Sequence, residues 1–235
     1  VENLRLELDI IEKDALVHVY PYGAITVGEK GETLADLEAM ADRVIGFSDD
    51  GRGVQSDDMM RAAMRRAKAL GKMIVAHCEV NDLLKGGYIH DGQYAAKHNH
   101  KGICSASEYE QIARDLKLVK EIGCKYHVCH ISTKEEIEMV RAAKSNNPDI
   151  IAETSCNYLW FCNEDYDRMG SRLKCNPSVK TSADREALRE GLANGLIDTI
   201  GSDHAPHLPA EKEGTYTKAP SVLPSIQQSL PVLLT

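Results

Sequence analysis

Short apolar runs alternate with longer amphipathic stretches along almost the whole chain. Runs such as "MIVAH" and "DIIAETS" have the length and β-branched content of buried strands, whereas "SDDMMRAAMRRAKALG" places Met60, Met64 and Ala67 on one face of a helix. In that helix Ser56 is a candidate N-cap and Gly71 a stop signal. The pattern predicts strands within residues 16–26, 44–48, 73–79, 125–131, 149–155 and 197–203, with helices within 3–14, 32–43, 56–71, 105–123, 132–144 and 182–195.

Two of these helices begin with a capping-box pattern, in which a hydroxyl residue precedes a glutamate by three positions. The pairs are Ser105 with Glu108 and Ser132 with Glu135. Strands that alternate with helices predict parallel strands joined by right-handed crossovers. An open doubly wound sheet and a (β/α)8 barrel both fit this order. Polar residues of interest follow several strands, which favours the barrel, whose active site lies at the carboxyl ends of its strands.

Composition excludes several classes of protein. Lys and Arg total 28 against 36 Asp and Glu, a net charge of -8, and no basic cluster interrupts this balance, so a nucleic-acid partner is not expected. No apolar run approaches the roughly 20 residues of a membrane span. The seven cysteines are scattered without a C-x-x-C pair, which favours free thiols in a reducing cytoplasm over disulfides or a zinc knuckle.

Four candidate ligands each come at the end of a predicted strand. Asp50 follows "VIGFSD", His77 ends "MIVAH", His130 ends "YHVCH" and Asp203 ends "IDTIGSD". Singly, a histidine in a strand packs in the core and an aspartate caps a helix or a turn. Together, at one rim of a barrel, histidine and carboxylate ligands predict a hydrolytic zinc site.

The other histidines are weaker candidates. His98 and His100 in "KHNHK" have H-x-H spacing but follow no strand, so we interpret them as a solvated loop without rigid support. His127 alternates with Cys129 on one face of its predicted strand, which leaves His130 as the better ligand at that strand end. His18, His90 and His204 receive no functional role.

The motifs "FSDDGRGVQ", "AHCE", "VCHIST", "KCNPSVK" and "SDHAPH" resemble, in order and spacing, those of dihydroorotases, cyclic amidohydrolases of the amidohydrolase superfamily. The resemblance covers essentially all 235 residues and is to the type in which an aspartate bridges two metal ions. It implies a (β/α)8 TIM barrel of which residues 1–235 form a single partial catalytic domain. That domain would run from about the second helix to just after the eighth strand, with about six of the eight strands present.

The resemblance also implies a role for each matching residue. His77 and His130 would bind one zinc ion, and Asp50, chosen over Asp49 by spacing, would bridge it to a second. Asp203 would bind the second ion and carry a proton from the attacking hydroxide to the leaving amide nitrogen. Asn176 and His207 would hold the substrate. The reaction implied is the reversible opening of dihydroorotate to N-carbamoyl-aspartate in pyrimidine synthesis.

Several departures from the family pattern keep alternatives open. The H-x-H motif of the first strand and the C-terminal region are missing, so we expect an internal fragment that binds one zinc or fewer and is inactive alone. "SCNYLWF" has Asn157 and Tyr158 where paired histidines are usual, and "APSVLPS" has Val222 and Leu223 where glycines are usual.

The alternatives are a hydantoinase or allantoinase, a non-catalytic dihydroorotase-like scaffold, and a metal-free doubly wound binding protein. A homodimer and association with aspartate carbamoyltransferase are the candidate assemblies.

Overall fold

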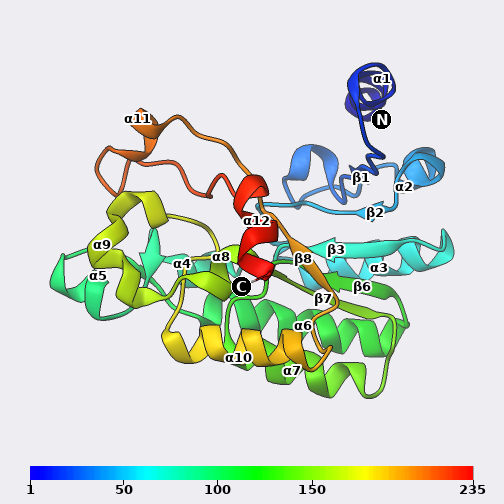
Figure 1. The fold of residues 1–235 in the computed structure, drawn as a ribbon. Helices are drawn as coiled ribbons and strands as arrows, with labels where there is room; N and C mark the ends of the chain where they lie inside the picture. Colours follow the sequence, from blue (N-terminus) through cyan, green and yellow to red (C-terminus); the bar gives the residue numbers. More distant parts are fainter. Residues whose placement is uncertain (235) are drawn as a thin grey trace. The chain divides into compact units, whose positions relative to one another are not determined.

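The computed structural model describes residues 1–234, which divide into two compact units, each described by itself below (Figure 1). Unit 1 comprises residues 1–78 and 114–127, and unit 2 comprises residues 79–113 together with the chain from Val128 onward. The long helix α6 (Ala106–Ile122) contributes to both units.

Unit 1 contains the first strands of the main sheet. Its elements are α1 (Glu2–Asp14), β1 (Tyr22–Gly23), η1 (Val27–Glu29), α2 (Leu37–Met40), η2 (Ala41–Arg43), β2 (Gly46–Phe47), α3 (Asp57–Ala69), β3 (Met73–Ala76) and most of β6 (Lys125–Val128). β1 pairs with β2 and β2 with β3, both parallel, with Gly46 opposite Met73 and Phe47 opposite Ile74. Phe47 and Ile74 are fully buried and lie in the core of this unit.

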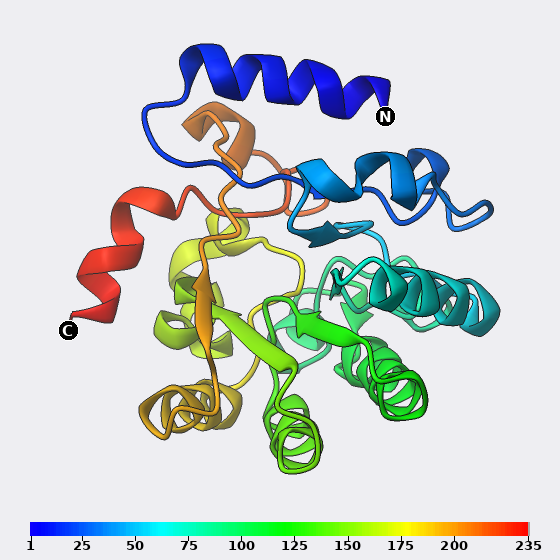
Figure 2. The ribbon, with the colours of Figure 1, turned by 90° about the vertical axis from the view of Figure 1, so that its right-hand side faces the viewer.

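Unit 2 contains the remaining strands and most of the helices. Its elements are α4 (Asn81–Leu84), β4 (Ile89–His90), α5 (Gln93–Lys97), β5 (Gly102–Ile103), α7 (Lys134–Lys144), β7 (Ile150–Ser155), α8 (Cys156–Trp160), η3 (Asn163–Asp165), α9 (Tyr166–Met169), η4 (Gly170–Leu173), α10 (Ser182–Ala193), β8 (Thr199–Gly201), α11 (Pro209–Lys212) and α12 (Ile226–Leu233). β7 and β8 pair in parallel, with Ser155 opposite Gly201. In Figure 2, α7 and α10 are seen nearly end-on, beside each other on one side of this strand pair.

The main sheet confirms the six predicted strands. Its order among the described residues is β1-β2-β3-β6-β7-β8, so strands that follow one another in the prediction are neighbours in the sheet. Several strands are shorter than predicted, and β1 has only two residues, Tyr22 and Gly23. A second, two-stranded sheet of β4 and β5 forms within what was predicted as a long polar loop.

The start and end signals of α3 act as predicted. The Ser56 hydroxyl accepts a hydrogen bond from Met59 N at 3.3 Å, and the chain leaves the helix through Gly71, whose φ is +70°. A cap of this kind stabilises a helix by about 1 kcal/mol. Met60, Met64 and Ala67 are buried on one face, as the hydrophobic spacing predicts.

The capping box predicted at Ser132 and Glu135 is wrong, and the Glu108 carboxylate of the box predicted at Ser105 binds other groups. The capping box of α7 is formed one residue later, by Thr133 and Glu136. At α6, the Glu108 carboxylate pairs instead with Lys180, Oε1 to Nζ at 2.6 Å, and accepts a hydrogen bond from Ser132 Oγ. Burial forces this change: Glu108 and Lys180 are both almost inaccessible, and a buried charge needs an opposite charge beside it.

Glu136 is buried next to this ion pair. Its Oε2 accepts hydrogen bonds from the amides of Ser132 and Thr133. Burial, together with the Glu108 charge, raises the pKa of Glu136 to about 8, so it binds a proton at neutral pH.

None of the helices in residues 1–234 is long and apolar enough to cross a bilayer. All seven cysteines are free thiols, as predicted from their spacing.

Candidate active site

Asp50 and His77 lie together in unit 1 because their strands are parallel neighbours. Asp50 follows β2 by three residues, and His77 directly follows β3. The carboxyl ends of parallel strands open on the same edge of a sheet, and Asp50 Oδ1 lies 3.9 Å from His77 Nδ1. His77 is 4% exposed, whereas 66% of the Asp50 side chain is accessible. The sequence therefore places a buried imidazole and an accessible carboxylate at one strand edge.

Asp49, the neighbouring carboxylate, has a structural role. Its Oδ1 accepts hydrogen bonds from the amides of Ile25 at 2.7 Å and Thr26 at 3.0 Å, and its Oδ2 accepts one from the Thr26 hydroxyl. Asp49 and Thr26 are both buried. These contacts tie the segment after β1 to the segment after β2. In the sequence, Asp50 was chosen over Asp49 as a ligand by spacing alone. The geometry is consistent with that choice, because the Asp49 carboxylate is occupied by backbone and hydroxyl donors.

His130 does not continue the strand before it. β6 ends at Val128, and His130 has a φ of +34°, in the region that L-residues rarely occupy. Its backbone amide donates to Glu153 Oε1 at 3.2 Å, from β7. The alternation of side chains along residues 125–131 therefore stops before His130, and alternation does not determine the direction of this imidazole.

Glu153 also lies against the end of β8 in unit 2. A Cβ on Gly201 would collide with the Glu153 carboxylate, so a larger residue there would require the Glu153 side chain to move. Two residues later comes Asp203, with a φ of +45° and a buried Oδ2. Non-glycine residues with positive φ are concentrated at functional sites. His130 and Asp203 are both such residues. The His130 amide donates to Glu153, and Asp203 comes two residues after Gly201, against which Glu153 lies. Glu153 itself was missed in the sequence because it lies inside an otherwise apolar strand.

Asn176 is oriented by a glutamate. Its Nδ2 donates to Glu79 Oε1 at 2.9 Å, and the Glu79 amide donates to Gln111 Oε1 at 3.0 Å. Glu79 is the last residue of the "AHCE" motif, so the motif could have identified it as a site residue from the sequence. The hydroxyl of Tyr158 donates to Pro177 O at 2.7 Å, which braces the same loop. Tyr158 is one of the two residues that replace the family's usual histidines, and here it supports the Asn176 segment.

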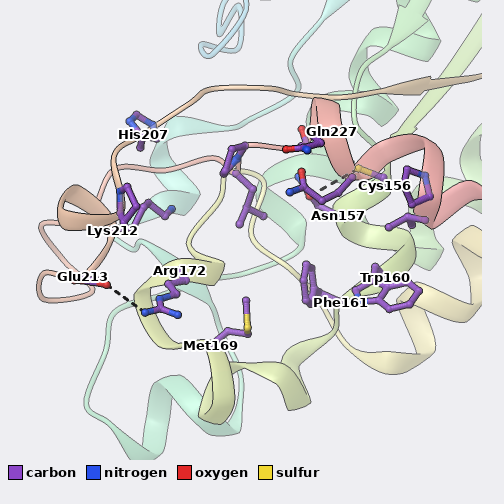
Figure 3. Close-up of a pocket in the computed structure, with 17 residues that line it drawn as sticks. Cys156, Asn157, Trp160, Phe161, Met169, Arg172, His207, Lys212, Glu213 and Gln227 are labelled. Atoms are coloured by element: carbon purple, nitrogen blue, oxygen red, sulfur yellow. Dashed lines mark hydrogen bonds and ion pairs between the residues drawn. The ribbon is translucent and has the colours of Figure 1, made fainter.

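His207 lies at the wall of a pocket in unit 2. Its Nε2 lies 3.0 Å from Ser221 O, and the pocket has a volume of about 950 Å³ (Figure 3). Asn157, the other residue at the usual histidine positions, lines the same pocket, as do the aromatic rings of Trp160 and Phe161. His204 has a structural role: its Nδ1 accepts hydrogen bonds from the first amides of the α12 region.

The prediction that His98 and His100 lack rigid support is wrong, although His98 is exposed to solvent as predicted. The His98 ring packs on Tyr94 at 4.3 Å between centroids, and the His100 Nδ1 lies 3.1 Å from the Tyr88 hydroxyl. Tyr166 and Tyr216 complete this aromatic cluster. Burial, with a smaller contribution from His98, lowers the pKa of His100. Tyr88 and Tyr94 lie within twelve residues of His100 in sequence, whereas Tyr166 and Tyr216 come from distant segments that the local pattern does not reveal.

The chain matches a family model described as dihydro-orotase-like over residues 2–136. It is 46% identical over 226 residues to a dihydroorotase of Geobacillus thermodenitrificans, which covers 96% of this chain and 53% of the relative. It is 41% identical to a dihydroorotase of Bacillus licheniformis over its whole length, which is 55% of the relative. The chain therefore spans about half the length of the curated relatives it matches.

Solved structures have the same fold. An L-hydantoinase (dihydropyrimidinase) from Arthrobacter aurescens superposes with a TM-score of 0.81 at 27% identity, covering 99% of this chain and 54% of that one. A dihydroorotase of Saccharomyces cerevisiae, crystallised with 5-fluoroorotic acid, gives a TM-score of 0.74 at 15% identity, covering 99% and 65%. The second likeness shows the fold alone. Together they confirm the α/β barrel class expected from the alternating strands and helices.

Proposed function

This chain belongs to the dihydro-orotase-like family, and from that membership we propose that its protein catalyses the reversible hydrolysis of dihydroorotate to N-carbamoyl-aspartate. The observation that carries the proposal is the match to dihydroorotases along nearly the whole chain. The step belongs to pyrimidine synthesis.

We assign residues 1–235 to one partial barrel domain, and the free thiols favour a cytoplasmic location. Homodimerisation and association with aspartate carbamoyltransferase stay predictions.

We propose Asp50, His77, His130 and Asp203 as ligands of zinc. The donor types fit, because zinc binds imidazole nitrogen and carboxylate oxygen. Asp50 Oδ1 and His77 Nδ1 lie 3.9 Å apart, so a small movement of the accessible Asp50 side chain would bring them to the roughly 3.4 Å that separates two ligand atoms of a tetrahedral zinc. When bound, such a metal polarises a carbonyl and activates water near neutral pH.

The remaining chemistry falls to side chains of the chain itself. Asp203 takes the proton of the attacking water and delivers it to the departing amide nitrogen, so the ring opens without a free amide anion. One oxygen of this carboxylate, Oδ2, is buried, although the residue itself is half-buried. Asn176, oriented through its amide by Glu79, and His207, oriented by Ser221 O, hold the substrate.

The test is ring opening measured on dihydroorotate, hydantoin and allantoin with the zinc-loaded full-length protein, because residues 1–235 alone are expected to be inactive. We expect turnover of dihydroorotate in preference to the other two. Asp203→Asn should reduce kcat by about 100-fold or more, the scale of general acid–base catalysis, and zinc content is measured beside it to separate proton transfer from metal loss. Preference for hydantoin would assign the chain to the related hydantoinases, and no turnover of any ring by a folded, zinc-loaded protein would refute the proposal.

A further inference from the structure

Lys212 is a buried lysine whose ammonium binds only main-chain carbonyls. It ends α11 and is 5% exposed. Its Nζ donates to the carbonyl oxygens of Lys174 at 2.9 Å, Pro220 at 2.9 Å and Val222 at 3.0 Å. An ammonium has three donors, so all three are used. Burial lowers the pKa of Lys212, because the buried ammonium loses hydration that the ammonium of a surface lysine keeps.

The three carbonyls belong to two segments that are distant in sequence. Lys174 precedes Asn176 by two residues, in the loop that Glu79 and Tyr158 also brace. Pro220 and Val222 flank Ser221, whose own carbonyl lies against His207 Nε2. One ammonium therefore joins the Asn176 segment to the segment that orients His207. Figure 3 shows the Lys212 and His207 side chains close together at one end of the pocket.

We propose that Lys212 is a positioning residue that fixes the Asn176 and His207 segments relative to each other, so that both bind one substrate. The inference rests on the proposed function for the identity of that substrate. The neighbouring contacts fit this role. Lys174 Nζ donates to Thr217 O at 3.1 Å, and Ser171 Oγ donates to Lys212 O, so the same two segments are joined on both sides of Lys212.

The backbone at Val222 gives a second reason for the ammonium. Val222 has a φ of +79°, which is strained for a β-branched residue. A strained conformation persists only where the surroundings hold it, and the Lys212 ammonium holds the carbonyl of this residue. Loss of the ammonium would leave three carbonyls without their donor and would release Val222 to a relaxed conformation, moving Ser221 with it.

The experiment compares Lys212→Met, which keeps an unbranched side chain one atom shorter than that of lysine and removes every donor, with Lys218→Met. Lys218 is an exposed lysine on the same loop and serves as the matched control. Hydrogen exchange of the amides is followed in residues 171–178 and 213–223, together with the kinetics of dihydroorotate opening. In Lys212→Met we expect faster exchange in both segments and a KM about tenfold higher with kcat little changed, the signature of lost ground-state binding.

The control should change neither exchange nor KM. Lys212→Arg keeps a charged donor and should fall between the wild type and Lys212→Met, and it replaces Lys212→Met if that variant does not fold. Faster exchange confined to residues 213–223 would overturn the proposal, as would an unchanged KM in a protein that turns over dihydroorotate. If no variant or wild type turns over substrate, the proposed function fails, while the exchange data still decide whether Lys212 joins the two segments.

Discussion

Replacing Asp49 by alanine removes the acceptor of three buried donors at once. These are the amides of Ile25 and Thr26 and the hydroxyl of Thr26. A buried donor left without a partner costs about 1–3 kcal/mol. At the lower end, three such donors lower the free energy of unfolding by about 3 kcal/mol, a large share of the roughly 5–15 kcal/mol that holds a domain folded.

Asp50→Ala is the matched control for this prediction. Its carboxylate is mostly exposed and approaches His77 Nδ1 at 3.9 Å. We expect its unfolding free energy to stay within about 0.5 kcal/mol of the wild type, as for most surface substitutions, while it retains less zinc. Urea denaturation followed by circular dichroism gives the first quantity, and elemental analysis after dialysis gives the second. If Asp50→Ala destabilises as much as Asp49→Ala, or if Asp49→Ala costs less than about 1 kcal/mol, the division of roles between the two carboxylates is wrong.

Three further substitutions test the packing of unit 2. Val222→Gly relieves a φ of +79° and should raise the unfolding free energy by about 1 kcal/mol in urea denaturation; a loss would mean that the valine packing outweighs the strain. Lys180→Met leaves Glu108 buried without its ion-pair partner, so it should cost about 3 kcal/mol or more in the same assay; a cost near zero would show that Glu108 accepts a proton there at little expense. Glu136 has a folded pKa of about 8 against 4.5 unfolded, so the folded state binds the extra proton between these values and stability falls as pH rises through them. Glu136→Gln should flatten that fall in unfolding measured from pH 5 to 8, and an unchanged slope would contradict the assignment.

Much of the fold could be predicted because its signals are local. The apolar runs that form β2, β3, β6, β7 and β8 are bounded by polar residues, and the strand order follows from parallel neighbours joined through helices. The capping boxes could not be predicted in the same way. Thr133 and Ser132 are both suitable caps, and the choice between them depends on the buried Glu108–Lys180 pair, whose partners are 72 residues apart in sequence.

In the candidate site, too, residues with a local signal in the sequence could be predicted, whereas residues that depend on contacts with other segments could not. His77 and Asp50 follow strands, and this position is visible in the sequence. Lys212 is not marked in this way, because its importance comes from contacts with other segments of the chain. His98 and His100 were misinterpreted in part for this reason: Tyr94 is close to them in sequence, but Tyr166 and Tyr216, which complete the cluster, come from distant segments.

The most direct test of the central claim is the zinc content of the folded protein after metal loading and dialysis, compared between the wild type and His77→Ala. The account predicts that the wild type retains zinc and that His77→Ala, folded by circular dichroism, retains measurably less. A folded wild type that retains no zinc, or a His77→Ala variant that retains as much as the wild type, would contradict the assignment of this strand edge to a metal.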